Sequence, residues 1–197
     1  EADRLLTEGL ELSRAIDEKN SECMTLGNLA RLRLKQGDAL GALELVTGAI
    51  ALATEIGYPN DKAFYRLIEG DAHLALGSLD AAAEAYETAL VGAEGKYEVD
   101  AVAGLADVAM ARGDSGAALE RVKPILDTAI AGGISMIADP LRAYISFHAV
   151  LRAVHDGRAH PVLDAARRLL DEVMGKIDDP AALETFRARA DVATLLA

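Results

Sequence analysis

Three histidines and one aspartate in the C-terminal third have side chains that could bind a metal ion. His148, His155 and His160 lie close together in the sequence, and Asp156 lies among them. On a helix, His148 and His155 would be two turns apart, which is too far for one ion, whereas His155 and His160 flank Gly157 and could meet. The i, i+4 histidine pair of a zinc-binding helix is missing, and so is a cysteine cluster. We therefore expect loop and groove histidines and no metal site.

Other residues with catalytic potential occur singly. Cys23 is the only cysteine. It lies near the start of an expected helix, where a thiolate is favoured, but a lone cysteine in an apolar helix is more often a small buried side chain. Gly132-Gly133 lacks the lysine of a phosphate-binding loop. Arg66 and Glu69 are three residues apart and fit an ion pair. We find no titratable cluster, and we predict no enzyme activity and no cofactor.

Composition narrows the class of partner. The chain has 197 residues, a net charge of −12, 51% hydrophobic and 4% aromatic residues. An acidic surface repels nucleic acid and anionic membranes, so we expect neither as a partner and favour a basic or amphipathic polypeptide. One cysteine allows no internal disulfide, which favours a cytoplasmic protein. No apolar run reaches the roughly 18–20 residues of a membrane span. The chain begins at Glu1 without a methionine, so we expect a piece of a longer protein.

Glycines at regular intervals predict where helix pairs turn. These glycines are Gly37, Gly77, Gly113 and Gly157. Small residues that allow close helix packing recur five and twelve positions after the first two glycines. The residues at these two positions are Ala42 and Ala49, Ala82 and Ala89, then Ala118 and Ile125, and finally Val162 and Leu169.

Further signals predict where the helices begin, bend and end. Asn20 or Ser21 can cap a helix, and Asp139-Pro140 and Asp179-Pro180 each combine a capping aspartate with a proline in the first turn. Pro124 lies inside an expected helix and should bend it. Gly132-Gly133 should end that helix. The segment from Pro180 to Leu196 is expected to be one closing helix.

These features resemble the tetratricopeptide repeat (TPR), whose unit is a pair of antiparallel helices. The residues that carry the resemblance are Leu29, Ala30, Gly37, Ala42, Ala49, Gly70, Gly77, Ala82, Tyr86, Ala89, Leu105, Ala106, Gly113 and Ala118. The resemblance implies an all-α, right-handed α–α solenoid that forms a single domain over 1–197. Its expected units are a half repeat at 1–19, repeats at 20–57, 60–95, 97–132 and 139–175, and a capping helix at 180–197.

A narrower resemblance rests on two stretches. Phe64 to Gly70 (FYRLIEG) and the tail from Pro161 to Ala197 are similar to the C-terminal repeat arms of large bacterial signalling ATPases, nucleotide cyclases and transcriptional activators. The resemblance implies a non-catalytic regulatory or sensing arm that binds a peptide, a protein or its own effector module. A stand-alone adaptor or self-assembly protein and a small-molecule sensor, with a pocket at Tyr144, Phe147 and His148, remain alternatives. The sequence does not indicate the oligomeric state.

The first helix of each pair should line the concave face of a solenoid and bind an extended peptide or helix there. The expected groove residues are Asn28, Arg31, Lys35, Phe64, Leu67, Asp71, Leu74, Asp100, Asp107, Tyr144, Phe147 and His148. Some TPR domains hold the acidic C-terminus of heat-shock chaperones in a clamp of lysine, asparagine and arginine. At the matching positions only Arg31 has a suitable charge, and Asp100 and Asp107 would repel a carboxylate, so we do not expect that ligand.

Overall fold

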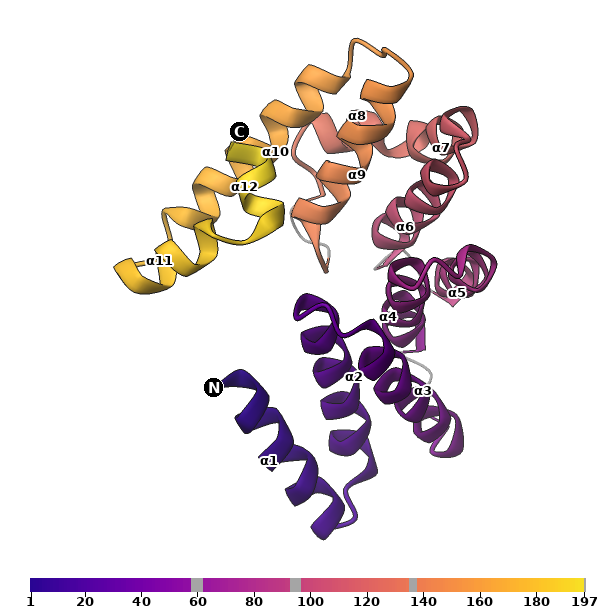
Figure 1. The fold of residues 1–197 in the computed structure, drawn as a ribbon, viewed down its shortest axis with the longest axis vertical. Coiled ribbons are helices and arrows are strands. Elements are labelled where there is room, and N and C mark those ends of the chain that lie inside the picture. The colour runs from indigo at the N-terminus through magenta and orange to yellow at the C-terminus, as the bar shows by residue number, and fades with distance from the viewer. Residues whose placement is uncertain (58–61, 93–96, 135–137, 197) are drawn as a thin grey trace. The chain divides into compact units, whose positions relative to one another are not determined.

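The computed structural model describes residues 1–57, 62–92, 97–134 and 138–196, and all of the regular structure in these ranges is helical (Figure 1). This confirms the predicted all-α fold of antiparallel helix pairs. The α-helices are α1 (Ala2–Ala15), α2 (Lys19–Lys35), α3 (Ala39–Glu55), α4 (Lys62–Ala75), α5 (Leu79–Gly92), α6 (Glu98–Ala111), α7 (Ser115–Val122), α8 (Leu126–Ile130), α9 (Pro140–Ala153), α10 (Ala159–Met174), α11 (Pro180–Arg187) and α12 (Ala190–Leu196).

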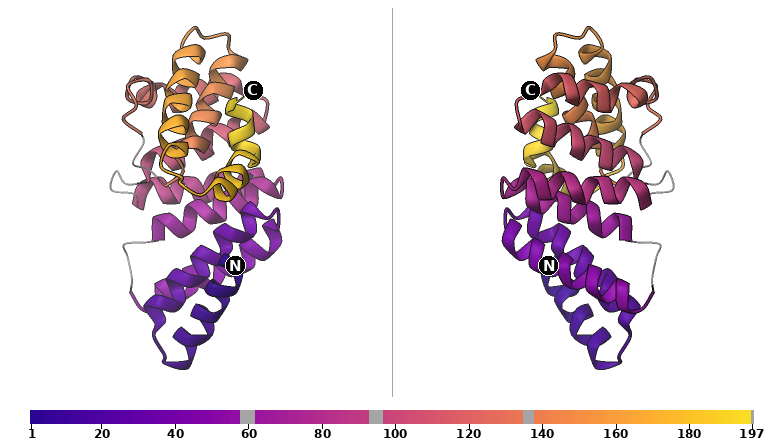
Figure 2. Two further views of the ribbon diagram at one scale, coloured as in Figure 1. Left: turned by 90° about the vertical axis from the view of Figure 1, so that its left-hand side faces the viewer. Right: turned by 90° about the vertical axis from the view of Figure 1, so that its right-hand side faces the viewer.

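The chain divides into two compact units, residues 1–104 and 105–197, and the boundary in the sequence falls within α6. In the first unit each helix from α1 to α4 packs against the next one along the chain, as the two views of Figure 2 also show. In the second unit α9 packs against both α7 and α10, and α12 packs against α9 and α10. The single domain over 1–197 stays a prediction.

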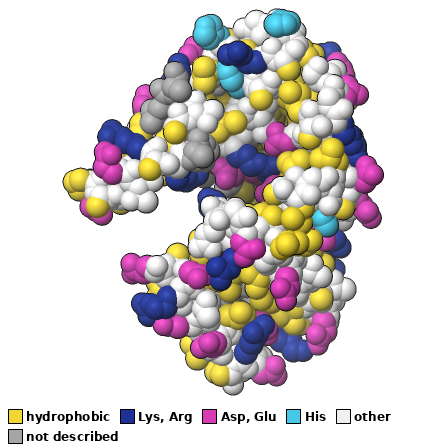
Figure 3. Space-filling view, viewed as in Figure 1, with side chains coloured by type: hydrophobic (Ala, Val, Ile, Leu, Met, Phe, Trp, Pro, Cys, Tyr) yellow, Lys and Arg dark blue, Asp and Glu magenta, His cyan; other side chains and the backbone are white. Residues whose placement is uncertain are grey.

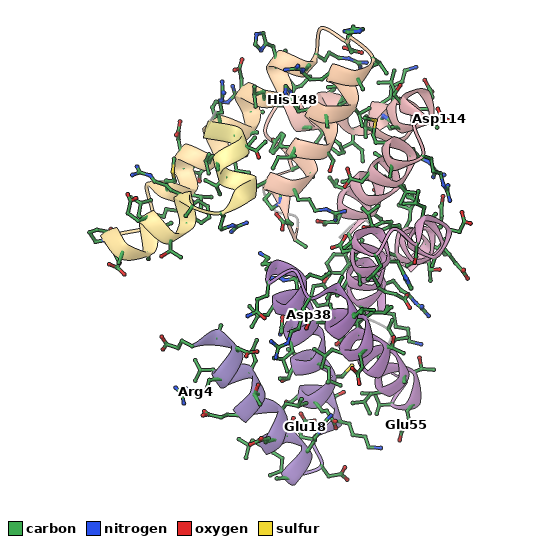
Figure 4. The ribbon with its side chains drawn as sticks, in the orientation of Figure 1. Arg4, Glu18, Asp38, Glu55, Asp114 and His148 are labelled. Carbon is green, nitrogen blue, oxygen red and sulfur yellow. The ribbon has the colours of Figure 1, made fainter. Side chains whose placement is uncertain are left out.

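Three of the predicted glycines turn one helix into the next. Gly37, Gly77 and Gly113 have φ values of +82°, +73° and +78°, a left-handed conformation that glycine adopts without strain. The side chain of the next residue then caps the following helix in two of these turns. Asp38 accepts a hydrogen bond from the Gly41 backbone N–H at 2.9 Å, and Asp114 lies at the corresponding turn before α7 (Figure 4). Each of the three turns is therefore three residues long.

Two turns differ from the prediction. Between α9 and α10 the left-handed residue is His155 (φ +56°) and not Gly157, and the loop is two residues longer than the other three. The predicted helix cap at Asn20 or Ser21 was also wrong. Glu18 caps α2 by accepting a hydrogen bond from the Ser21 backbone N–H at 2.8 Å, and this bond holds the pKa of Glu18 below its usual value. α2 thus begins one residue before Asn20, and its N-cap is Glu18.

Alanine and tyrosine form the core of the first unit. The alanines predicted to pack between these helices are fully buried. Tyr65 and Tyr86 are almost completely buried as well. The Tyr86 ring lies against Gly70, where an added Cβ would be only 2.6 Å from its Cε1 atom, and it also covers Gly104. Its hydroxyl donates a hydrogen bond to Asp71 at 2.6 Å. Tyr86 on α5 therefore packs directly on the backbones of α4 and α6.

The second unit contains one predicted bend and one unpredicted break. α7 ends at Val122, a 3₁₀ turn spans Lys123–Ile125, and α8 follows, which confirms the bend at Pro124. The closing segment was predicted as one helix but is two, α11 and α12, and α11 has no buried residue. α12 packs back on α10, where the Arg167 Nε–H donates to the Leu195 carbonyl at 3.0 Å. Val192 and Leu195 of α12 are buried, so the apolar contacts of this segment come from α12 and not from α11.

Candidate functional site

One face of α2 is exposed along its whole length. Met24, Asn28, Arg31 and Lys35 are all exposed, and they lie thirteen, nine, six and two residues before the left-handed Gly37. This spacing places them on one side of a helix with 3.6 residues per turn. The opposite side of α2 is buried, with Cys23 and Ala30 fully inaccessible to solvent. α2 therefore offers a stripe of side chains to a ligand without any loss of packing.

A groove of about 430 Å³ runs between α1 and α2. Apolar side chains form most of its lining, and its two charged residues are both cationic. The lining residues are Ala2, Leu5, Leu6, Asn28, Arg31, Leu32 and Lys35. Leu5 is 53% exposed. α1 thus contributes an apolar wall that the sequence analysis did not assign to the site, although an exposed leucine on an amphipathic helix was a signal for it.

A second hollow, of about 150 Å³, adjoins the groove at Asn28, which lines both. Met24, Phe64, Tyr65 and Tyr97 line the rest of it. The Arg31 guanidinium lies 5.8 Å from the centre of the Phe64 ring, a cation–π distance that holds the arginine over the aromatic side chain. We call the lining residues of the groove and this hollow together the α2 surface. Figure 3 shows hydrophobic side chains gathered on the first unit between scattered charged ones.

In the part of the chain that the structure describes, the cations of the α2 surface form no ion pair, whereas most other cations of the first unit do. Within the described residues, Arg31 and Lys35 form no ion pair. Neighbouring cations do: Arg33 pairs with Asp3 at 3.1 Å, and Arg4 pairs with Glu8 at 2.8 Å. Two positive charges one helical turn apart are thus available for a ligand, and they border an apolar floor.

The structure brings four of the predicted groove residues together on the α2 surface: Asn28, Arg31, Lys35 and Phe64. Asp71 and Leu74 are half-buried on α4, and Asp71 accepts the hydrogen bond of Tyr86. Leu67 and Asp100 are buried, with exposures of 5% and 4%. These two side chains pack inside the first unit and do not line the α2 surface.

The four predicted groove residues of the second unit do not form a surface site. Tyr144 and Phe147 are buried, with exposures of 1% and 0%; the Tyr144 hydroxyl donates to the Ala129 carbonyl at 2.8 Å, and burial raises its pKa. The His148 Nδ1 atom lies 3.0 Å from the Ala159 carbonyl oxygen, on α9 (Figure 4). Asp107 pairs with Arg142 at 3.2 Å.

The position of the turn explains the burial of Tyr144 and Phe147. The prediction counted from Gly157, but the left-handed residue is His155. Tyr144 and Phe147 lie eleven and eight residues before His155, and the residues at these distances before Gly37 are Leu26 and Leu29, which are also buried. An error of two residues rotates a helix by about 200°, so the buried face was assigned to the groove.

Chemical sites elsewhere in the described residues are sparse. No group of three or more His, Cys, Asp or Glu side chains in this part of the chain could hold a metal ion. Cys23 is fully buried with its Sγ 3.2 Å from the Ala49 carbonyl oxygen. Arg66 and Glu69 form the predicted ion pair at 2.6 Å. Among the helices that the structure describes, none is both long and apolar enough to cross a membrane.

Antiparallel helix pairs with glycine turns, and a first helix whose outer face is exposed, define a TPR-like fold. Comparison with solved structures supports this. BtubC (BKLC) from P. vanneervenii is similar, with 20% identity and a TM-score of 0.66, over 98% of this chain and 81% of that one. A putative kinesin light chain with nearly identical TPR-like repeats from Podosopora anserina has 18% identity and a TM-score of 0.55, over 87% of this chain and 92% of its own. No family model and no curated protein sequence matches the chain.

Proposed function

We propose that the chain is a non-catalytic protein–protein interaction module that binds a polypeptide segment on the α2 surface. The observation that carries this proposal is that the groove and the hollow adjoin and share Asn28 as a lining residue. Leu5 and Met24, at 53% and 49% exposure, would lose water on binding, and each Å² of apolar surface covered contributes roughly 25 cal/mol. A binding segment can therefore gain free energy by covering these exposed apolar side chains.

Photo-cross-linking in the cells of origin tests this surface. A photoreactive amino acid placed at exposed Asn28 should yield a covalent adduct with a polypeptide. The same amino acid at exposed Glu44, on α3 and outside the α2 surface, serves as the control. Adducts at Asn28 alone support the proposal. Equal yields at both positions, or none at Asn28, contradict it.

In its finer form the proposal makes this module the regulatory arm of a larger cytosolic bacterial regulator. The support is the resemblance of Phe64 to Gly70 and of the tail from Pro161 to the arms of such proteins. Binding would shift the active–inactive balance of the effector module by preferring one state. An antibody against this segment should detect a native polypeptide several times heavier than 20.7 kDa. A band near that mass would leave the stand-alone adaptor in its place.

The small-molecule alternative has less support. It relied on a pocket at Tyr144, Phe147 and His148, but two of these side chains are buried and the hydroxyl of Tyr144 is already hydrogen-bonded. No specific observation in the described residues favours that alternative over polypeptide binding.

A further inference from the structure

We infer that the segment bound by the α2 surface is an acidic amphipathic helix. This inference rests on the proposed function and specifies the chemistry of the partner. A bound helix would place leucine-like side chains in the groove between α1 and α2, and carboxylates beside Arg31 and Lys35. The net charge of the chain predicts a preference for basic partners. The local charge of the α2 surface points to the opposite sign.

The unpaired cations carry the electrostatic part of the argument. Arg31 and Lys35 are the charged members of the groove lining, and neither forms an ion pair within the described residues. The chain carries 32 acidic and 20 basic side chains, so acidic side chains outnumber the cations that could pair with them. Two carboxylates at i and i+4 on a partner helix have a matching spacing. Each such contact adds a charge-assisted hydrogen bond.

The geometry of Arg31 favours a defined binding mode. Its guanidinium lies 5.8 Å from the centre of the Phe64 ring, so part of its conformational freedom is already restricted before a ligand arrives. A planar guanidinium held over a ring can still donate two parallel hydrogen bonds to a carboxylate. Lys35 supplies a second positive charge one helical turn along α2.

Asp100, one of the two carboxylates expected to repel an acidic partner, does not line the α2 surface. Asp100 is only 4% exposed. Asp3, on the neighbouring α1, is paired with Arg33, and Glu8 is paired with Arg4. The net charge of −12 would repel an acidic segment from the acidic parts of the surface, so such a partner should prefer the two cations of the α2 surface.

The test uses two synthetic peptides of about 15 residues, long enough for four helical turns. Both have the same leucine face and blocked ends, and they carry either glutamate or lysine on the polar face. Fluorescence anisotropy measures binding to the full chain. The glutamate peptide should bind saturably, with a Kd below about 1 mM, and the lysine peptide more weakly. Blocked ends exclude capture of a free C-terminal carboxylate.

Two pairs of variants locate the contact. The double variant R31E/K35E should weaken binding of the glutamate peptide by about tenfold or more, since two attractions become repulsions. Lys62→Glu, which reverses another exposed charge outside the α2 surface, should change it less than about twofold. Leu5→Ser should also weaken binding by about tenfold, and Leu12→Ser should not, because Leu12 is exposed on α1 but does not line the groove.

The outcomes separate this inference from the proposed function. Preference for the lysine peptide, indifference to R31E/K35E, or no saturable binding of the glutamate peptide overturns the acidic partner. If Asn28 still yields polypeptide adducts in cells, the proposed function survives that result with a partner of different chemistry. Loss of binding in R31E/K35E and in Leu5→Ser, with both controls intact, supports the inference.

Discussion

At the scale of single residues, a tyrosine ring on a glycine backbone replaces the usual contact between two side chains. Tyr86 is fully buried against Gly70, and its hydroxyl is anchored on Asp71. An anchored ring cannot move aside for a larger neighbour, because it would lose the hydrogen bond and open a void. The small-residue pattern predicted close packing here, and the aromatic was expected beside it. The specific contact between Tyr86 and Gly70 depends on tertiary structure.

Gly70→Ala should therefore destabilise the protein although alanine is the better helix former. The added methyl group would lie 2.6 Å from the Tyr86 ring, and overpacking of this kind costs roughly 1–3 kcal/mol. Gly9→Ala on α1 is the matched control: nothing lies within 4 Å of its added Cβ, so a gain of about 0.5–1 kcal/mol is expected. Urea denaturation measures both. Equal stabilisation by the two variants would contradict the packing at Tyr86.

Ala89→Asp tests the helix-pair core more severely. Ala89 is completely buried, so an aspartate there would place an unpaired charge between helices, at a cost of several kcal/mol. Circular dichroism should show a large loss of helix or a much lower melting temperature. Ala51→Asp, at an exposed position on α3, should shift the free energy of unfolding by less than about 1 kcal/mol. An unchanged melting point for Ala89→Asp would refute the repeat assignment.

At the scale of elements, the sequence predicted helix ends well where one residue type determines the turn. The turns at Gly37, Gly77 and Gly113 were found because glycine adopts the left-handed conformation without strain. The turn after α9 uses His155 in that conformation, which histidine adopts more often than most residues but far less often than glycine, and Gly157 lies only two residues away. The groove register of α9 failed for this reason. The wall that α1 adds to the α2 surface was also missed, because its position depends on how α1 packs on α2.

The loop after α9 has a titratable contact that should respond to pH. Hydrogen bonds from Arg158 lower the pKa of Asp156 from its ordinary 3.8 to about 2. A lowered pKa in the folded state means that the contact stabilises the protein above about pH 4, and that this stabilisation is lost as the pH falls from about 4 to 2. The melting-temperature difference between the wild type and Asp156→Asn should therefore shrink across this range. A constant difference would show that the contact does not titrate with folding.

At the scale of the whole molecule, net charge opposes folding. The −12 charge repels itself, whereas most of the ion pairs in the described residues are exposed and individually weak. We expect the repulsion among like charges to outweigh the attraction within ion pairs, so adding salt should stabilise the protein. Raising the salt concentration from about 0.05 to about 0.5 M should increase the melting temperature, because screening weakens long-range repulsion. A lower melting temperature in high salt would mean that the ion pairs dominate.

The contacts of Tyr86 have a consequence for the order of the repeats. Tyr86 lies nine residues after Gly77, and the position nine residues after Gly37 is Val46. Excision of the α4–α5 pair would bring Val46 to the place where Tyr86 covers Gly104, and a space close to the size of a phenol ring would stay unfilled. The side chains of one helix pair therefore fit only the particular pair that follows it. Duplication, deletion or shuffling of one pair would have to change the tyrosine and the glycine together, so this solenoid cannot be lengthened simply by copying a unit.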